Sequence, residues 1–202
     1  MNHSGDEALF FGEGFDPAAL FGREAPLEVE IGSGRARFLV AAARDNPAHD
    51  FLGLERSLSY YRVCRERVAR AGLANARVLR ADGRMFAESL KPGSVRAFHV
   101  YFPDPWPKKK QRKRRLLDAV TLDLLAERLE PGGTLRIATD YAGYGRVIRS
   151  LLETVHALEG LAWDALPAPP PSSFEVKYQS EGRPIWRFLC VKRVTRGEAT
   201  GP

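Results

Sequence analysis

Residues 102–107, called here the aspartate loop, combine a carboxylate and an aromatic ring with three prolines. The prolines alternate with the other residues, and each proline ring fixes its own φ and restricts the residue before it. We therefore expect a stiff loop that presents Asp104 in one orientation. A carboxylate can accept hydrogen bonds from a base edge that carries two donors, and the ring of Trp106 can stack on a base.

Positive charge follows the aspartate loop directly. Seven of the eight residues at 108–115, the basic segment, are Lys or Arg. A charge run is usually a solvated surface, but cations at this density repel one another and gain little from a surface helix. Phosphate groups would neutralise them and make binding sensitive to salt, so we expect contact with RNA. The segment begins without an apolar face, which disfavours a membrane surface.

The composition of the whole chain agrees with an anionic partner. The 202 residues carry a formal net charge of +6 and have a pI near 9.5, although a soluble protein can be basic without binding nucleic acid or membranes. The hydrophobic fraction of 44% can supply one sizeable core, and the length suits one domain. The position of the charge beside the aspartate loop is what favours nucleic acid.

The cysteines and the N-terminal residues bear on compartment. Cys64 and Cys190 stand far apart without a C-x-x-C pattern, which argues against a zinc site or a disulfide framework and suits a reducing cytosol. Asp6 and Glu7 lie where a signal peptide needs positive charge. No stretch approaches the roughly 18 apolar residues of a membrane helix. We expect a cytoplasmic protein without membrane contact.

Short apolar segments alternate with amphipathic ones from residue 27 onward. The segments expected to be parallel strands are 27–31, 51–54, 76–79, 95–102 and 134–138. The expected helices are 38–43, 57–72 (capped by Ser57), 112–128 and 144–158. This alternation predicts a mostly parallel sheet covered on both faces, a doubly wound Rossmann-like α/β fold. Residues 165–173 predict a proline-rich loop or polyproline crossover, and residues 183–193 predict a last, antiparallel strand.

The chain is expected to divide into three parts. Residues 1–26 form an N-terminal arm without clear periodicity, residues 27–193 form the folded domain, and residues 194–202 form a flexible C-terminal tail. No internal repeat or second domain is visible. The sequence implies no obligatory protein partner and leaves a monomer or a homodimer open.

Glycines and carboxylates gather where the expected strands end. In doubly wound sheets a ligand lies beyond the carboxyl ends of the strands, and the residues at these ends are Glu30, Gly32, Gly34, Glu55, Asp82 and Asp104. Each carboxylate alone is more simply explained as a helix cap or a solvated group. The ordered set, one strand end after another, favours a cofactor site.

The identity of the cofactor follows from what this set includes and lacks. A dinucleotide fingerprint needs glycine at position 37, and the chain has Arg37. Gly32 and Gly34 still let the backbone approach a ligand, Glu55 can accept from ribose hydroxyls, and Asp82 can accept from an adenine amino group. Carboxylates would repel a pyrophosphate, whereas S-adenosylmethionine carries a sulfonium and an amino group and no phosphate.

Several motifs together resemble bacterial tRNA (guanine-N7)-methyltransferases. They are Glu30-Ile31-Gly32-Ser33-Gly34, Phe102-Pro103-Asp104-Pro105-Trp106-Pro107-Lys108-Lys109, Lys113-Arg114-Arg115, Ala138-Thr139-Asp140, and Phe174-Glu175 with Gly182-Arg183-Pro184-Ile185-Trp186. The resemblance runs from about residue 27 to residue 193, which would make this part a methyltransferase domain. The aspartate loop with its basic tail is highly specific, whereas the glycine pair occurs in many methyltransferases.

The resemblance implies a role for each matching residue. S-adenosylmethionine would be bound by Glu30, Gly32, Gly34, Glu55, Asp82 and Asp104, with Asp104 also catalytic. The substrate, a guanine in the variable loop of tRNA, would be bound by Lys108, Asp140, Ser172, Ser173, Phe174 and Glu175. The family typically has threonine where this chain has Ser172, which keeps the hydroxyl and loses a methyl group.

The chemistry of guanine N7 limits what the protein must do. N7 has a free lone pair, so methyl transfer needs alignment of the reacting atoms more than a general base. Two alternatives remain from the sequence. The chain could be a non-enzymatic RNA-binding module on a methyltransferase fold, which cofactor binding would exclude. It could also be a methyltransferase or NAD enzyme for small molecules, which a comparison of free nucleosides with tRNA would test.

Overall fold

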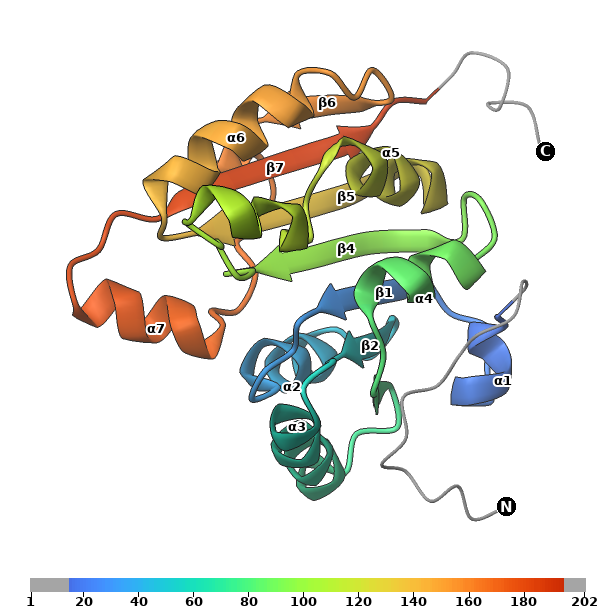
Figure 1. Ribbon diagram of the computed structural model, residues 1–202. Coiled ribbons are helices and arrows are strands. Elements are labelled where there is room, and N and C mark those ends of the chain that lie inside the picture. The colour runs from blue at the N-terminus through green and yellow to red at the C-terminus, as the bar shows by residue number, and fades with distance from the viewer. Residues whose placement is uncertain (1–14, 195–202) are drawn as a thin grey trace.

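The computed structural model describes residues 15–194, which form one seven-stranded sheet with helices on both faces (Figure 1). The strands are β1 (Leu27–Ile31), β2 (Asp50–Leu54), β3 (Ala76–Leu79), β4 (Val95–Tyr101), β5 (Leu129–Thr139), β6 (Leu158–Leu161) and β7 (Trp186–Lys192). The α-helices are α1 (Pro17–Phe21), α2 (Arg37–Asp45), α3 (Leu58–Ala71), α4 (Gly83–Ser89), α5 (Ala119–Arg128), α6 (Ala142–Leu152) and α7 (Ser173–Ser180). Two 3-10 helices, η1 (Lys109–Arg114) and η2 (Trp163–Ala165), complete the set.

The strand order is β3-β2-β1-β4-β5-β7-β6. β1 pairs in parallel with both β2 and β4, and only β7 runs antiparallel to its two neighbours, β5 and β6. The predicted doubly wound fold with an antiparallel C-terminal strand is therefore confirmed. The chain reverses its direction of winding between β1 and β4, so their carboxyl ends form the switch point at which ligands bind in such sheets.

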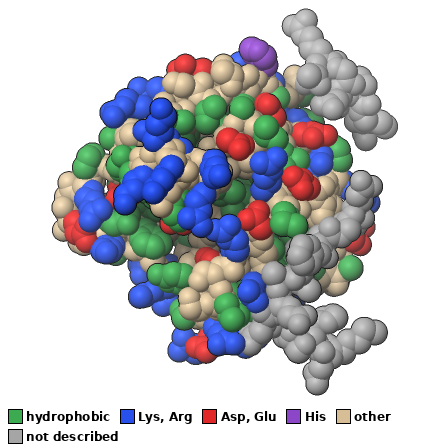
Figure 2. Space-filling view, viewed as in Figure 1, with side chains coloured by type: hydrophobic (Ala, Val, Ile, Leu, Met, Phe, Trp, Pro, Cys, Tyr) green, Lys and Arg blue, Asp and Glu red, His purple; other side chains and the backbone are tan. Residues whose placement is uncertain are grey.

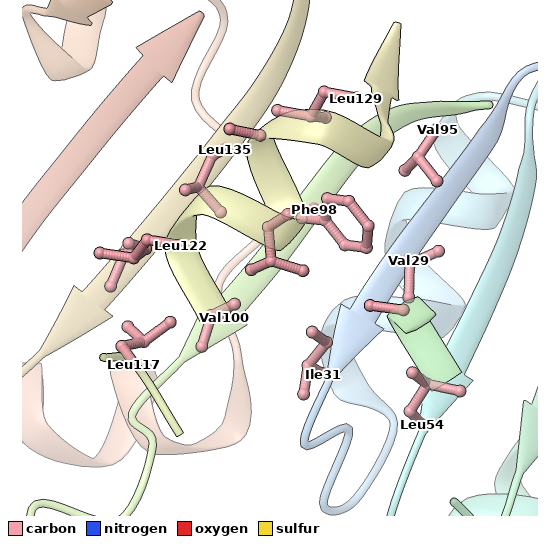
Figure 3. Packing of buried hydrophobic residues seen from close by; sticks show 14 of the residues in the cluster. Val29, Ile31, Leu54, Val95, Phe98, Val100, Leu117, Leu122, Leu129 and Leu135 are labelled. Atoms are coloured by element: carbon pink, nitrogen blue, oxygen red, sulfur yellow. The ribbon is translucent and has the colours of Figure 1, made fainter. Parts of the chain in front are cut away.

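Two clusters of buried side chains cover the two faces of the sheet. Val29 of β1, Phe98 and Val100 of β4 and Leu122 of α5 belong to one of these clusters (Figure 3). Phe38 of α2 and Cys64 of α3 belong to the cluster on the other face. In Figure 1, α2 and α3 lie together below β1 and β2, and α5 and α6 lie over β5 and β7. Alternation along the strands sends successive side chains to opposite clusters.

The face that packs against α2 also contains a chain of polar groups. Glu28 bonds to His49 Nδ1 and to His99 Nε2 at 2.7 Å each, and His99 Nδ1 lies 2.9 Å from Tyr101 Oη. These bonds satisfy polar groups in an otherwise apolar layer, and the two imidazoles lower the pKa of Glu28 despite the opposing effect of burial. The network links β1 to β4 below the switch point.

Several element predictions were wrong in extent. The expected helix 112–128 is split into η1 and α5, because Asp118 caps α5 by accepting from Thr121 N at 2.8 Å and the crowded cations before it form only a 3-10 turn. The expected helix 144–158 ends at Leu152, and the chain then forms β6. Ser57 stands at the start of α3, but its side chain makes no capping hydrogen bond.

Five short elements have no counterpart in the sequence prediction: α1, α4, β6, η2 and α7. Of the expected N-terminal arm, residues 17–21 form α1, and residues 1–14 lie outside the described part, as do residues 195–202 of the expected C-terminal tail. None of the helices within residues 15–194 has the length and apolar character needed to cross a membrane.

Candidate active site

A cavity of about 680 Å³ opens at the carboxyl ends of β1, β2 and β4. Of the residues predicted to bind the cofactor or the substrate, those that line it are Gly32, Gly34, Glu55, Asp82, Asp104 and Phe174. Another cavity of about 580 Å³, between α6, β6 and β7, contains none of the predicted site residues. The cavity at the switch point is therefore the candidate active site.

Glu55 holds together the two loops on one side of this cavity. Its Oε2 accepts a hydrogen bond from Gly34 N at 2.9 Å, and its Oε1 accepts from Ser57 N at 2.8 Å. Gly32 and Gly34 have φ values of 85° and 53°, a left-handed conformation that glycine adopts without steric cost. The carboxylate thus stabilises both the glycine turn and the start of α3.

Asp82 plays a similar part at the start of α4. Its Oδ1 accepts from Arg84 N at 3.0 Å and from Met85 N at 3.3 Å, and its Oδ2 lies 3.6 Å from Arg56 Nη1. The next residue, Gly83, packs so closely on β1 that a Cβ atom would collide with the Ile31 side chain. Gly83 also lines the cavity, and sequence analysis did not single it out.

Glu30 occupies a different position from the other predicted carboxylates. Its side chain is 3% exposed and is not part of the cavity lining. Burial, opposed by a hydrogen bond with Ser33, raises the pKa of Glu30 well above its ordinary value. Its Oε2 has no hydrogen-bond partner within residues 15–194. Glu30 is therefore a buried carboxyl group with capacity for one more donor.

The aspartate loop is held in an unfavourable backbone conformation. Phe102 and Trp106 have φ values of 54° and 37° although each precedes a proline, and bulky residues at positive φ are strained. Three contacts hold the loop: Phe102 N donates to Ala138 O at 2.7 Å, Arg115 Nε donates to Pro105 O at 2.8 Å, and the Arg114 guanidinium lies 4.3 Å from the Trp106 ring centroid.

Asp104 is presented by this loop at the cavity surface. It is exposed, and within residues 15–194 neither a hydrogen bond nor an ion pair engages its carboxylate. Its oxygens are thus available to donors of a ligand, in contrast to those of Glu55. The strained, multiply held loop agrees with the predicted stiffness of residues 102–107.

The basic segment contains cations of two kinds. Residues 108–110 and 112–114 are exposed, whereas Arg115 is half-buried and lies 4.5 Å from the ring centroid of Tyr144 on α6. Lys108 precedes η1 and does not line the cavity. The exposed cations are placed for phosphate contact, but Arg115 supports the aspartate loop.

The remaining predicted substrate residues lie on or beside α7. Ser172 caps this helix by accepting from Glu175 N at 3.1 Å, and Ser173 is its first residue. Phe174 is 38% exposed and lines the cavity. Glu175 is 7% exposed and accepts from Arg187 Nη2 at 2.6 Å. Asp140, from the end of β5, accepts from Arg183 Nη1 at 2.9 Å.

An aromatic cluster between the aspartate loop and α7 was missed by sequence analysis. The ring of Phe102 lies 5.3 Å from that of Tyr178 and 6.3 Å from that of Phe174, and the Arg183 guanidinium lies 4.5 Å from the Tyr178 ring. Phe174 and Tyr178 are four residues apart on α7. That spacing would have revealed one aromatic face if a helix had been predicted here.

Comparisons with known sequences identify relatives over most of the chain. A family model described as "Putative methyltransferase" matches residues 24–188. The tRNA (guanine-N(7)-)-methyltransferase of Halorhodospira halophila is 39% identical over 172 residues, which cover 83% of this chain and 73% of that protein. The protein of the same name from Methylococcus capsulatus is 39% identical over 181 residues, which cover 87% and 78%.

Solved structures are similar in fold at low sequence identity. The 16S rRNA methyltransferase KamB has a TM-score of 0.58 and 17% identity, with 91% of this chain and 95% of that chain covered. The aminoglycoside resistance methyltransferase NpmB1 has a TM-score of 0.57 and 16% identity, with 85% and 89% covered. These neighbours confirm a methyltransferase fold, and the sequence relatives define the group within it. The chain belongs to the tRNA (guanine-N7)-methyltransferase family.

Proposed function

We propose that this protein transfers a methyl group from S-adenosylmethionine to N7 of a guanine in the variable loop of tRNA, in the cytoplasm. The observation that carries the proposal is the position of Asp104. An exposed carboxylate without a partner within residues 15–194 lies at the cavity, between a glycine-lined turn and a row of exposed cations. This order matches a cofactor, a base and a phosphate backbone.

The polar groups around the cavity suit S-adenosylmethionine. Each oxygen of Glu55 accepts one backbone hydrogen bond and retains a lone pair for a ribose hydroxyl. Asp82 follows β3, lines the cavity at the start of α4, and would accept from the adenine amino group. We propose that the cofactor's amino group reaches Glu30, because a buried oxygen without a partner costs free energy that such a donor removes. The turn at Gly32 and Gly34 lets the cofactor approach the backbone.

Asp104 is proposed to orient the guanine. When bound, the cofactor supplies an electrophilic methyl group on a sulfonium. Asp104 accepts from the guanine edge that bears N1–H and the exocyclic amino group, which leaves N7 on the opposite edge free to face the methyl group. No residue has to remove a proton, because the N7 lone pair is already available. The product base is cationic, and the carboxylate of Asp104 stabilises the charge as it develops.

The other predicted substrate residues are proposed to surround this base. Phe174 lines the cavity and offers a ring for stacking. Asp140 accepts from Arg183 and Glu175 accepts from Arg187, so these pairs would hold α7 beside the base. Ser172 caps this helix and Ser173 is its first residue. Lys108 and the exposed cations that follow it would bind phosphates of the tRNA.

The proposal is tested by methylation of an unmodified tRNA transcript, with the product mapped by chemical cleavage at N7-methylguanine. Wild-type protein should modify one guanine in the variable loop and should leave free guanosine unmodified. Asp104→Ala should lower kcat by about 100-fold or more, the usual cost of removing a group that stabilises developing charge. Asp123→Ala, a carboxylate exposed on α5, serves as the control. Near wild-type activity of Asp104→Ala, or methylation at another atom, would contradict the proposal.

A further inference from the structure

Helix α6 lies against the basic segment and continues its positive surface. Leu117 N, just after the basic segment, donates to Tyr144 Oη on α6 at 3.0 Å, and Arg115 lies over the ring of Tyr144. These contacts dock the basic segment on the first turn of α6. Arg146 and Arg149, in the next two turns, are exposed. Exposed cations therefore stand on two elements that contact each other, and Arg149 also lines the cavity between α6, β6 and β7.

Arg146 and Arg149 lack carboxylate partners. Within residues 15–194 neither lies within ion-pair distance of an Asp or Glu side chain, and the same holds for the cations of the basic segment. Arginines elsewhere do find partners: Arg96 lies 3.0 Å from Glu130, and Arg187 lies 2.6 Å from Glu175. Unpaired cations on neighbouring elements repel one another and are stabilised by an external polyanion.

Packing orients Arg149. Its guanidinium lies 4.9 Å from the ring centroid of Trp186, and Trp186 packs so tightly on α6 that a Cβ atom at Gly145 would lie 2.6 Å from the indole. A guanidinium stacked on an aromatic ring keeps its N–H groups at the edges free to bind phosphate. Arg149 is thus held ready for an anion, whereas Arg146 projects from the helix without such support.

The charge pattern has a direction. Figure 2 shows Lys and Arg side chains gathered over the basic segment and the adjoining part of α6, while acidic side chains lie over the neighbouring α5. Asp123 and Glu127 supply exposed negative charge on α5. A polyanion that leaves the candidate active site is therefore repelled from α5 and attracted toward α6.

We propose that α6 is a second RNA-binding element, on which the tRNA backbone held by the exposed cations of the basic segment continues to Arg146 and Arg149. The inference rests on the proposed function, since it extends the same substrate over a further surface. It assigns to α6 a role in affinity and none in the chemical step, because both arginines lie outside the lining of the candidate active site.

The test compares two double variants that change net charge equally. Arg146→Gln/Arg149→Gln removes the proposed contacts. Arg44→Gln/Arg70→Gln removes two exposed arginines near the C-terminal ends of α2 and α3, at the opposite edge of the sheet. The affinity of a labelled tRNA transcript is measured by fluorescence anisotropy over a range of salt concentrations, and KM and kcat are measured for methylation.

Each lost phosphate contact reduces the slope of log K against log salt by about 0.7–0.9. The α6 variant should therefore lose about 1.4–1.8 units of slope, and its affinity deficit relative to wild type should shrink about tenfold between 50 and 200 mM salt. KM for tRNA should rise, with kcat and the affinity for S-adenosylmethionine unchanged. The control variant should keep the wild-type slope.

Two further results separate this inference from its alternatives. Arg149→Lys keeps the charge and loses the stack on Trp186, so it should retain most of the slope of log K against log salt. If Arg149→Lys lost as much slope as Arg149→Gln, Arg149 would only support packing. An unchanged slope in the α6 variant, or an equal loss in the control, would overturn the inference, and the surface would then suit an acidic protein instead. Failure of wild-type protein to bind tRNA would instead contradict the proposed function.

Discussion

The two sides of the candidate active site differ in how far their polar groups are already satisfied. On the side formed by β1, β2 and β3, Glu55 and Asp82 accept hydrogen bonds from the backbone that follows each strand. On the side formed by the aspartate loop and the basic segment, Asp104 and the exposed cations have no carboxylate or hydrogen-bonded side-chain partner within residues 15–194. On the first side the fold itself engages Glu55 and Asp82, whereas on the second side Asp104 is left for a ligand to engage.

This difference separates stability from activity. Groups on the first side support the glycine turn and the starts of α3 and α4, so their loss should weaken the fold together with ligand binding. On the second side, Asp104 and the exposed cations other than Arg114 hold no other part of the structure, so their loss should change catalysis or RNA affinity alone. Strain at Phe102 and Trp106 belongs to the second side and is sustained by contacts from Arg114 and Arg115.

The largest change in stability is expected for Glu55→Ala. The substitution leaves Gly34 N and Ser57 N without their acceptor, and losing hydrogen bonds to a charged group should lower the free energy of unfolding by about 3 kcal/mol. Urea denaturation measures the effect. Asp104→Ala is the matched control and should stay within about 0.5 kcal/mol of wild type. Equal destabilisation by both variants would remove the contrast between the two sides.

Glu30→Gln should improve stability while it weakens cofactor binding. The folded pKa of Glu30 is raised above its unfolded value, so the folded state binds more protons and wild-type stability falls as pH rises through the window between the two values. The stability of the variant lacks this fall, so the variant should be more stable than wild type at pH 7. At pH 5 its advantage over wild type should be smaller. Its affinity for S-adenosylmethionine should drop by about tenfold or more, because a charged hydrogen bond is lost.

Glu28→Gln, on the same face of the sheet, should change stability at neutral pH in the opposite direction from Glu30→Gln. The pKa of Glu28 is lowered by its bonds to His99 and His49, although burial opposes this. Its carboxylate therefore contributes stability above the unfolded pKa of about 4.3, and this contribution is lost as pH falls through the lower folded pKa. Urea denaturation from pH 3 to pH 7 should show the two variants diverging from wild type in opposite directions at neutral pH.

Arg115→Lys should affect turnover more than RNA affinity. Lysine keeps the charge but loses the Nε–H donor to Pro105 O and the planar stack on Tyr144. We expect kcat to fall about fivefold, a cost of roughly 1 kcal/mol for a less well positioned Asp104, with little change in the Kd of tRNA. Lys110→Gln should do the reverse, lowering the salt slope by about 0.9 with kcat unchanged. The same pattern in both variants would mean that the basic segment acts as one unit.

The smallest effect is expected for Ser172→Thr, which restores the residue typical of the family. Either hydroxyl can cap α7 by accepting from Glu175 N, so the free energy of unfolding and kcat should stay within about 0.5 kcal/mol of wild type. Ser172→Ala removes the cap and should cost about 1 kcal/mol. Thermal unfolding monitored by circular dichroism distinguishes the two. A large gain from threonine would show that the missing methyl group matters for packing.

Sequence patterns predicted more of the first side of the site than of the second. Short apolar strands, each followed by a glycine or a carboxylate, are local signals, and parallel strands bring their ends to one edge without further information. The position of Glu30 could not be inferred in this way. Whether a side chain at a strand end faces a cavity or lies beneath it depends on its neighbours on the other strands, which the sequence does not specify.

The remaining predicted substrate residues, on or beside α7, depend on contacts between distant segments. The bonds of Asp140 to Arg183 and of Glu175 to Arg187 join β5, α7 and β7. No spacing in the sequence predicts such pairs. Helices α4 and α7 have only seven and eight residues, too few for a clear apolar period. The different roles of residues within the basic segment could not be predicted either, because Arg114 and Arg115 differ in what they contact and not in residue type.

The strand order β5-β7-β6 has a consequence for how the protein is made. Of the strands within residues 15–194, β7 is synthesised last, yet it lies between two strands synthesised earlier, and within the same residues β6 is hydrogen-bonded to the sheet through β7 alone. A nascent chain that has emerged as far as α6 can already assemble β1 to β5, with the glycine turn and Glu55 in place, because domains begin to fold during synthesis. The arginines that pair with Asp140 and Glu175 arrive only with the final segment. The part proposed to bind the cofactor can thus form before α7 is fixed to the sheet by these ion pairs, and a chain that stops short of β7 would leave an open sheet edge at β5.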